Sequence, residues 1–264
     1  MKKAAFSIAA VAAMGFVFAT TSSPVAGQAG GTIVGHIKYM GPTPVNSLIR
    51  MGGDPRCNRL YVGKRPMTQS FTVAPDGAFA DVLVDVEGNF PGTPVPSTPV
   101  VLDQKDCQYA PHVLGARVGQ TLQVKNEDPT EHNIHAASTL GNEFNTTQPI
   151  NGPVYDVKLK GAEMLHVRCD NHTWMSAYIG IVDNPYFAVS ARDGTFTINT
   201  VPAGKQTIKA WHEVMGMQTQ MVDVQPGKTT TVDFTFAPKA AASLGPIEEL
   251  VIPHGVQTLA FVRN

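Results

Sequence analysis

Residues 163–182 read EMLHVRCDNHTWMSAYIGIV, which is two short apolar runs on either side of a loop that carries Cys169, His172 and Met175. The runs are rich in β-branched or aromatic residues and bounded by turn residues, which is typical of β-strands. Since no long amphipathic helix is visible, the stretch predicts an all-β sandwich. Five similar runs precede it: 100–102, 113–118, 121–126, 133–137 and 154–159.

More strands are predicted on both sides of this block. Residues 32–39 alternate between apolar and polar positions, as a half-buried strand does. After Pro185 a second set of five strand-like runs fills about 50 residues, the size of a small β-sandwich. We therefore expect four segments: a leader at 1–29, a first sandwich at 30–183 that includes the N-terminal strands as an extension, a second sandwich at 184–238, and a tail at 239–264.

The composition agrees with this organisation and excludes some partners. The 264 residues include 24 Gly and 20 Pro, which suits many short strands joined by tight turns. The formal net charge is −1, so the chain lacks the basic field that nucleic acid or an anionic membrane would attract.

The first 29 residues have the pattern of a secretory signal peptide. Lys2 and Lys3 precede an uncharged apolar stretch at 4–19, and small residues follow at Ala26, Gly27 and Ala29. An uncleaved anchor is the alternative, but the apolar stretch is shorter than the ~20 residues that span a bilayer. We expect a mature protein that is periplasmic or secreted and is not held in a membrane.

Export would place the three cysteines, Cys57, Cys107 and Cys169, in an oxidising compartment. An odd number leaves one cysteine unpaired, and three pairings are possible by arithmetic alone. We favour a Cys57–Cys107 disulfide, because Cys169 lies among residues that suit a metal.

Two segments carry the candidate metal ligands, Glu131–His135 and Cys169–Met175. A thiolate, an imidazole and a thioether within seven residues, with a further His on another strand, match the His₂Cys plus Met ligand set of a blue-copper centre. Each residue also has an ordinary interpretation: a buried thiol or disulfide partner, a surface histidine, a core methionine. A zinc site is possible as well, although Met is a poor ligand for zinc.

The two upstream histidines cannot serve the same ion if their strand is regular. His132 and His135 are three positions apart, so their side chains point to opposite faces of a strand. One of them is therefore expected to be structural.

These segments resemble the cupredoxins, and in spacing the amicyanins most closely. Amicyanins carry Pro-His-Asn-Val-His and Cys-x-x-His-x-x-Met, and this chain has Glu131-His132-Asn133-Ile134-His135 and a Cys-x-x-His-x-x-Met loop from Cys169 to Met175. The resemblance implies a Greek-key cupredoxin-like sandwich that holds one type 1 copper ion. It implies these ligands: His132, Cys169 and His172 as equatorial ligands and Met175 as the axial one.

The same resemblance gives roles to the neighbours of the ligands. Asn133 matches a residue that hydrogen-bonds toward the Cys loop, and His135 matches a position that is not a ligand. Glu131 replaces a proline, which would put a carboxylate beside the site.

The second sandwich resembles a carboxypeptidase-regulatory-like (transthyretin-like) module through Asp193-Gly194-Thr195-Phe196 and Pro202-Ala203-Gly204. The resemblance implies a smaller transthyretin-like sandwich with an interaction or stabilising role. The pair His212-Glu213 ends one of its strands, and we interpret it as a surface pair in preference to a metal or docking site.

The predicted function is electron transfer by an exported type 1 copper protein with a transient redox partner protein, the exposed edge of His172 being the electron exit. The alternative is a periplasmic copper-binding or delivery protein, or a non-redox interaction protein on the same sandwich. We do not expect an enzyme, because neither Gly-x-Ser-x-Gly nor His-Glu-x-x-His occurs in the chain.

Overall fold

The structure is a computed structural model that describes residues 30–238. Within these residues a single α-helix, α1 (Pro55–Leu60), accompanies a series of β-strands, which confirms the predicted all-β class. The expected signal peptide (1–29) and tail (239–264) lie outside the described residues. Over the described range, no helix has the length and apolar character needed to cross a membrane.

Residues 100–182 form one sandwich of two sheets, with strand orders β4-β3-β6-β9 and β5-β11-β10-β7-β8. Its core is an apolar cluster between the sheets that includes Leu102, Leu122, Ile134 and Leu165. The strands are β3 (Val100–Lys105), β4 (Gln108–Ala110), β5 (Val113–Arg117), β6 (Thr121–Asn126), β7 (His132–Ala136), β8 (Phe144–Gln148), β9 (Tyr155–Lys158), β10 (Glu163–Arg168) and β11 (Ser176–Val182).

A second sandwich has the strand orders β13-β1-β16, with β17 also on β1, and β12-β2-β14-β15. Its separate core includes Ile33, Phe79, Ile208 and Phe234. The strands are β1 (Gly31–Tyr39), β2 (Leu83–Glu87), β12 (Phe187–Val189), β13 (Thr195–Val201), β14 (Gly204–His212), β15 (Gly216–Val224), β16 (Thr229–Thr231) and β17 (Phe234–Phe236).

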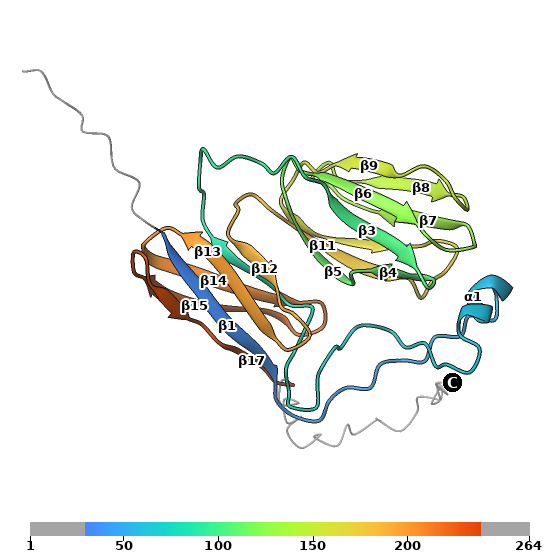
Figure 1. The fold of residues 1–264 in the computed structure, drawn as a ribbon, viewed down its shortest axis with the longest axis horizontal. Helices are drawn as coiled ribbons and strands as arrows, with labels where there is room; N and C mark the ends of the chain where they lie inside the picture. The colour runs from blue at the N-terminus through green and yellow to red at the C-terminus, as the bar shows by residue number, and fades with distance from the viewer. Residues whose placement is uncertain (1–29, 239–264) are drawn as a thin grey trace, which may run out of the picture.

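This pairing differs from the expected extent of the first sandwich, 30–183, at its N-terminal end. β1 pairs with β13, β16 and β17, and β2 pairs with β12 and β14, so the N-terminal strands belong to the second sandwich and are no extension of the first. Alternation predicted that 32–39 is a strand but could not predict its partners, which lie more than 150 residues away. We call 100–182 the inserted sandwich, because it lies between two paired strands of the host sandwich formed by β1, β2 and β12–β17 (Figure 1).

The two sandwiches pack directly on each other where glycines leave room. A Cβ on Gly180 in β11 would lie 2.3 Å from Leu83 Cδ2, and one on Gly115 in β5 would lie 2.7 Å from Phe187. A hydrogen-bonded pair adds to this contact, because His112 Nε2 lies 2.5 Å from Glu213 Oε1 and both side chains are nearly buried. The interpretation of His212-Glu213 as a surface pair is therefore wrong.

A long segment leaves the end of β1, passes beside the inserted sandwich and returns to the host (Figure 1). We call residues 41–66 the arm; they contain α1, and a bridge between Leu48 and Met67 closes its base. The predicted disulfide is confirmed: Cys57 of α1 is bonded to Cys107, with the Cα atoms 5.7 Å apart. Cys107 lies in the tight turn between β3 and β4, where φ is positive at both Asp106 and Cys107, as a two-residue hairpin turn requires.

Candidate metal centre

β7 brings His132 to the site by strand alternation. Ile134 and Ala136 on this strand face the core of the inserted sandwich, and His132, fully buried, shares their face. His135 lies on the other face, where its Nδ1 is 2.8 Å from Asp170 Oδ2 and 3.1 Å from an Arg168 nitrogen. The two histidines are thus separated as the spacing predicts, and only His132 reaches the candidate site.

Cys169 continues the inward face of β10 after Leu165 and Val167, and its side chain is buried. The loop that follows is closed by two backbone hydrogen bonds: Met175 N–H donates to His172 O at 2.8 Å, and Cys169 N–H donates to Met175 O at 3.3 Å. This turn folds His172 back over the thiol that precedes it by three residues.

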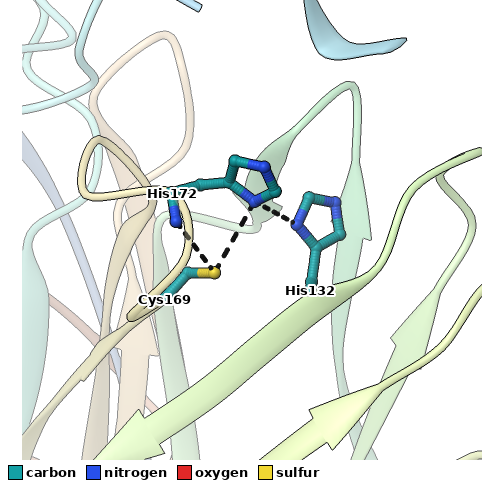
Figure 2. Close-up of side chains that lie close together, drawn as sticks. All are labelled: His132, Cys169 and His172. Atoms are coloured by element: carbon teal, nitrogen blue, oxygen red, sulfur yellow. Dashed lines mark hydrogen bonds between the residues drawn. The ribbon is translucent and has the colours of Figure 1, made fainter. Parts of the chain in front are cut away.

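His132, Cys169 and His172 converge in the structure (Figure 2). The two Nδ1 atoms lie 2.9 Å apart, and Cys169 Sγ lies 3.7 Å from His172 Nδ1. All three side chains are buried, and one donor atom from each lies within 4.8 Å of the other two. Two strands and one tight loop therefore direct a sulfur and two nitrogens to one point.

The thiol of Cys169 is held in an environment that favours its ionised form. Backbone N–H groups of Asn133 and His172 each donate to Sγ at 3.4 Å. Burial raises the pKa of the thiol, but hydrogen bonds from His132, His172 and these two N–H groups outweigh it and lower the pKa to about 6. The thiolate, which is the form that binds a metal, is therefore favoured at neutral pH.

A carboxylate lies behind His132. Its Nε2 is 2.8 Å from Asp128 Oδ2, an oxygen that also accepts the Cys107 backbone N–H. Burial lowers the pKa of His132, but hydrogen bonds with Asp128 and Cys169 outweigh it, so the pKa is raised. A carboxylate on the outer nitrogen fixes the orientation of a ligand histidine.

A second carboxylate lies behind His172, and it comes from the arm. His172 Nε2 is 3.1 Å from Asp54 Oδ2. Burial raises the pKa of Asp54, but hydrogen bonds from Thr130, two backbone N–H groups and His172 outweigh it and lower the pKa to about 2. Sequence analysis missed both carboxylates. The spacing of four residues between Asp128 and His132 was a weak signal for the first, and only the nearby Cys57 could have pointed to Asp54.

The expected exposed edge of His172 is not present. Its residue exposure is 6%, because Asp54 and Cys57 of the arm lie against the ring, with Cys57 Sγ 4.0 Å from Nε2. Sequence spacing could not predict this cover, since it is supplied by a loop more than 110 residues upstream.

The remaining two predicted residues lie next to this cluster. The Asn133 side chain accepts the Asp170 backbone N–H at 3.2 Å and donates to Asn145 Oδ1 at 2.7 Å, so it ties β7 to the Cys loop and to β8. Met175 is buried in the same apolar cluster as Cys169, and its backbone follows His172 in the closed loop. Its role as axial ligand stays a prediction.

The donor set fits a copper ion. Each Nε2 faces a carboxylate, and the two Nδ1 atoms face each other at 2.9 Å. In the form that binds a metal, each Nε2 carries the ring proton and both Nδ1 atoms present lone pairs. Two buried acceptors at that distance repel unless a proton or a cation lies between them. Two imidazole nitrogens with a thiolate, and a thioether close in sequence, are donors that copper prefers.

Comparisons with known proteins concern the fold. No family model matches the chain, and no curated protein matches it in sequence. Similar solved structures include a Cu-containing nitrite reductase from Thermus scotoductus SA-01, with 19% identity, a TM-score of 0.31, and coverage of 37% of this chain and 25% of that one. An amicyanin variant in the Cu(I) form has 17% identity and a TM-score of 0.29, covering 37% of this chain and 97% of that one.

A purple cupredoxin from Nitrosopumilus maritimus has 19% identity and a TM-score of 0.28, covering 31% of this chain and 98% of that one. The chain thus spans a quarter of the length of the nitrite reductase and nearly all of the two smaller proteins. The predicted all-β class with two β-sandwiches is confirmed by the strand pairing itself.

Proposed function

We propose that this chain is an exported type 1 copper protein that carries electrons, with His132, Cys169, His172 and Met175 as its ligands. The observation that carries the proposal is the convergence of two histidine Nδ1 atoms and one thiol on a buried point. Copper bound there supplies one-electron oxidation and reduction.

The protein side chains would hold this site in one arrangement. Asp128 and Asp54 fix the two imidazoles from their outer nitrogens, and two backbone N–H groups hold the sulfur. Asn133 would keep the Cys loop against β7 through its bond to Asp170. A rigid ligand cage of this kind suits electron transfer, since little has to move when the charge of the ion changes.

Burial of the site supports a carrier in preference to an enzyme. His132, Cys169 and His172 are 0%, 1% and 6% exposed, so a substrate has no open path to the ligands. An electron needs no such path, and a redox partner protein can dock transiently over a small area. We propose that the host sandwich, as a transthyretin-like module, stabilises the inserted one.

Copper binding by the purified protein tests the proposal. Addition of Cu(II) to the metal-free protein should produce the intense visible absorption of a thiolate–copper bond, with one ion bound per chain. Cys169→Ser should abolish this absorption, because no other free cysteine exists in the described residues. A colourless protein that binds only Cu(I) would support the copper delivery alternative, and failure to bind copper would overturn both.

Two histidines of one strand give the matched control. His132→Ala should abolish or strongly alter the absorption, whereas His135→Ala should leave it nearly unchanged, because His135 faces Asp170 and not the cluster. The reverse result would show that the ligand on β7 is wrongly assigned.

A further inference from the structure

The arm brings the host sandwich into contact with the candidate metal centre. Every ligand that we propose belongs to the inserted sandwich, yet the group that faces the outer nitrogen of His172 belongs to the arm, which lies between the host strands β1 and β2 in the sequence. Asp54 lies 118 residues upstream of its partner. A contact this distant in sequence depends on how the arm is anchored.

One carboxylate links three parts of the chain. Asp54 Oδ1 accepts the backbone N–H groups of Arg56 and Cys57 at 2.7 and 3.2 Å and so caps α1. Its Oδ2 accepts the Thr130 hydroxyl at 2.7 Å and faces His172 Nε2 at 3.1 Å. The side chain is therefore fixed at both oxygens, and its position determines which nitrogen of His172 carries the proton.

The arm is attached to the inserted sandwich by residues that precede Asp54 in the sequence and by residues that follow it. The Cys57–Cys107 disulfide is the covalent link, and the Tyr61 hydroxyl donates to Asp106 O at 2.9 Å. Arm residues Ile49 and Met51 are buried in the same small apolar cluster as the disulfide, and Trp174 packs on it from the Cys169–Met175 loop.

We propose that Asp54 is a positioning residue that orients His172 through Nε2, and that the disulfide-tethered arm is a cover that closes the metal centre. The inference rests on the proposed function for what the site does. The contacts of Asp54 and of the arm are contacts within the protein and do not depend on a bound metal. Without Asp54 the ring of His172 would lose the acceptor that fixes its tautomer, and without the tether the ring would face solvent.

The cover also restricts which partners can reach the site. A redox partner would dock on the arm or on another face, because α1 and its disulfide occupy the space beside His172 Nε2. Small exogenous ligands and chelators would be excluded until the arm opens.

The reactivity of Cys169 tests in metal-free protein whether the arm covers the site. In metal-free protein with the disulfide intact it is the one free thiol of the described residues, and it is 1% exposed. Its alkylation by iodoacetamide therefore reports opening of the cover. The double variant Cys57→Ser with Cys107→Ser should accelerate alkylation roughly tenfold or more, and limited proteolysis of the arm should increase in parallel.

Asp54→Asn separates orientation from folding. Asn is as good a helix cap as Asp, so α1 should persist, but its NH₂ group cannot accept the proton of His172 Nε2 if its oxygen caps the helix. We expect nitrogen NMR of the metal-free protein to show a changed His172 tautomer, and alkylation of Cys169 to rise roughly tenfold, as the loss of a hydrogen bond to a charged group would cause.

Glu131→Gln is the matched control, because it removes the negative charge of an exposed side chain beside His132 while Asp54 and the disulfide stay in place. It should leave the tautomer and the alkylation rate unchanged. If Asp54→Asn also leaves both unchanged while circular dichroism shows a native fold, the positioning role is wrong. If the double serine variant stays folded and alkylates at the wild-type rate, the cover is wrong. Neither result depends on whether the protein binds copper.

Discussion

The host and inserted sandwiches have apolar cores of similar character, but they differ in what else they bury. The inserted sandwich encloses His132, Asn133, Asp128, Gln104 and Gln148 near its core, whereas the host buries fewer polar side chains, among them Asp85, Ser190 and His212. Burying polar groups costs free energy unless they are paired. Most of that cost therefore falls on the part that holds the candidate site, and we expect the host to contribute more to stability.

The largest expected effect comes from a cavity in the host core. Phe234→Ala removes a fully buried ring of β17 and should lower the free energy of unfolding by about 3–5 kcal/mol. Urea unfolding of the metal-free protein measures this loss. Copper uptake by the folded fraction should remain, because Phe234 is not part of the inserted core. If copper uptake disappeared while the protein stayed folded, the division of roles between the sandwiches would be wrong.

A pH-dependent effect should also belong to the host. His212 lies among Phe71, Phe79 and Phe236, and its Nδ1 accepts two backbone N–H groups. Burial lowers its pKa from 6.5 to about 4. Between these values the unfolded chain binds a proton that the native one does not, so stability falls as the pH drops, by up to roughly 3 kcal/mol.

His212→Gln should remove this part of the pH dependence. Urea unfolding at several pH values between 6.5 and 4 gives the slope for each protein. Equal slopes in the wild type and the variant would show that His212 titrates normally in the folded host.

Adding one methyl group at the contact between the sandwiches should lower the free energy of unfolding. Gly180→Ala would place a Cβ 2.3 Å from Leu83 Cδ2 and should cost about 1–3 kcal/mol, as overpacking does. Leu83→Ala in the same chain should restore part of the loss, and a double-mutant cycle measures the coupling. Gly53→Ala is the control, because beyond its chain neighbours no residue has an atom within 4 Å of the added Cβ. Additive losses would mean that the two residues do not meet in solution.

The smallest expected change in stability is at the predicted axial ligand. Met175→Leu conserves volume in the inserted core and should cost less than about 1.5 kcal/mol. If Met175 is the axial ligand, the redox titration of the copper-loaded protein should shift to a higher potential, since a donor that favours Cu(II) is lost. An unchanged potential would assign Met175 to packing alone.

Short-range patterns predicted much of the inserted sandwich and its site. Alternation along 132–136 separated His132 from His135, and the Cys169–Met175 spacing placed a thiol and an imidazole in one loop. The oxidising compartment and the odd count predicted one disulfide, and the metal-like surroundings of Cys169 selected Cys57 and Cys107 as its partners. These inferences succeeded because each depends on residues that are neighbours in sequence or on chemistry that is independent of the fold.

Long-range pairing could not be predicted in the same way. Nothing in the alternation of 32–39 identifies β17 as a partner, and nothing in the loop at 41–66 shows that Asp54 would meet His172. The burial of Glu213 against His112 was missed for the same reason. Such contacts arise when elements that are distant in sequence pack together. The local periodicity of a single sequence predicts each element but not its partner.

The pairing of β1 also sets an order of folding. β1 is the first described strand to be synthesised, and its partners β13, β16 and β17 lie near the end of the described chain, with His36 N–H bonded to Asp233 across 197 residues. The contacts of the inserted sandwich span shorter stretches, so it can fold while the host is incomplete. Until the last strands emerge, β1 is a strand with one apolar face and open edges, the kind of segment that aggregates and that chaperones protect.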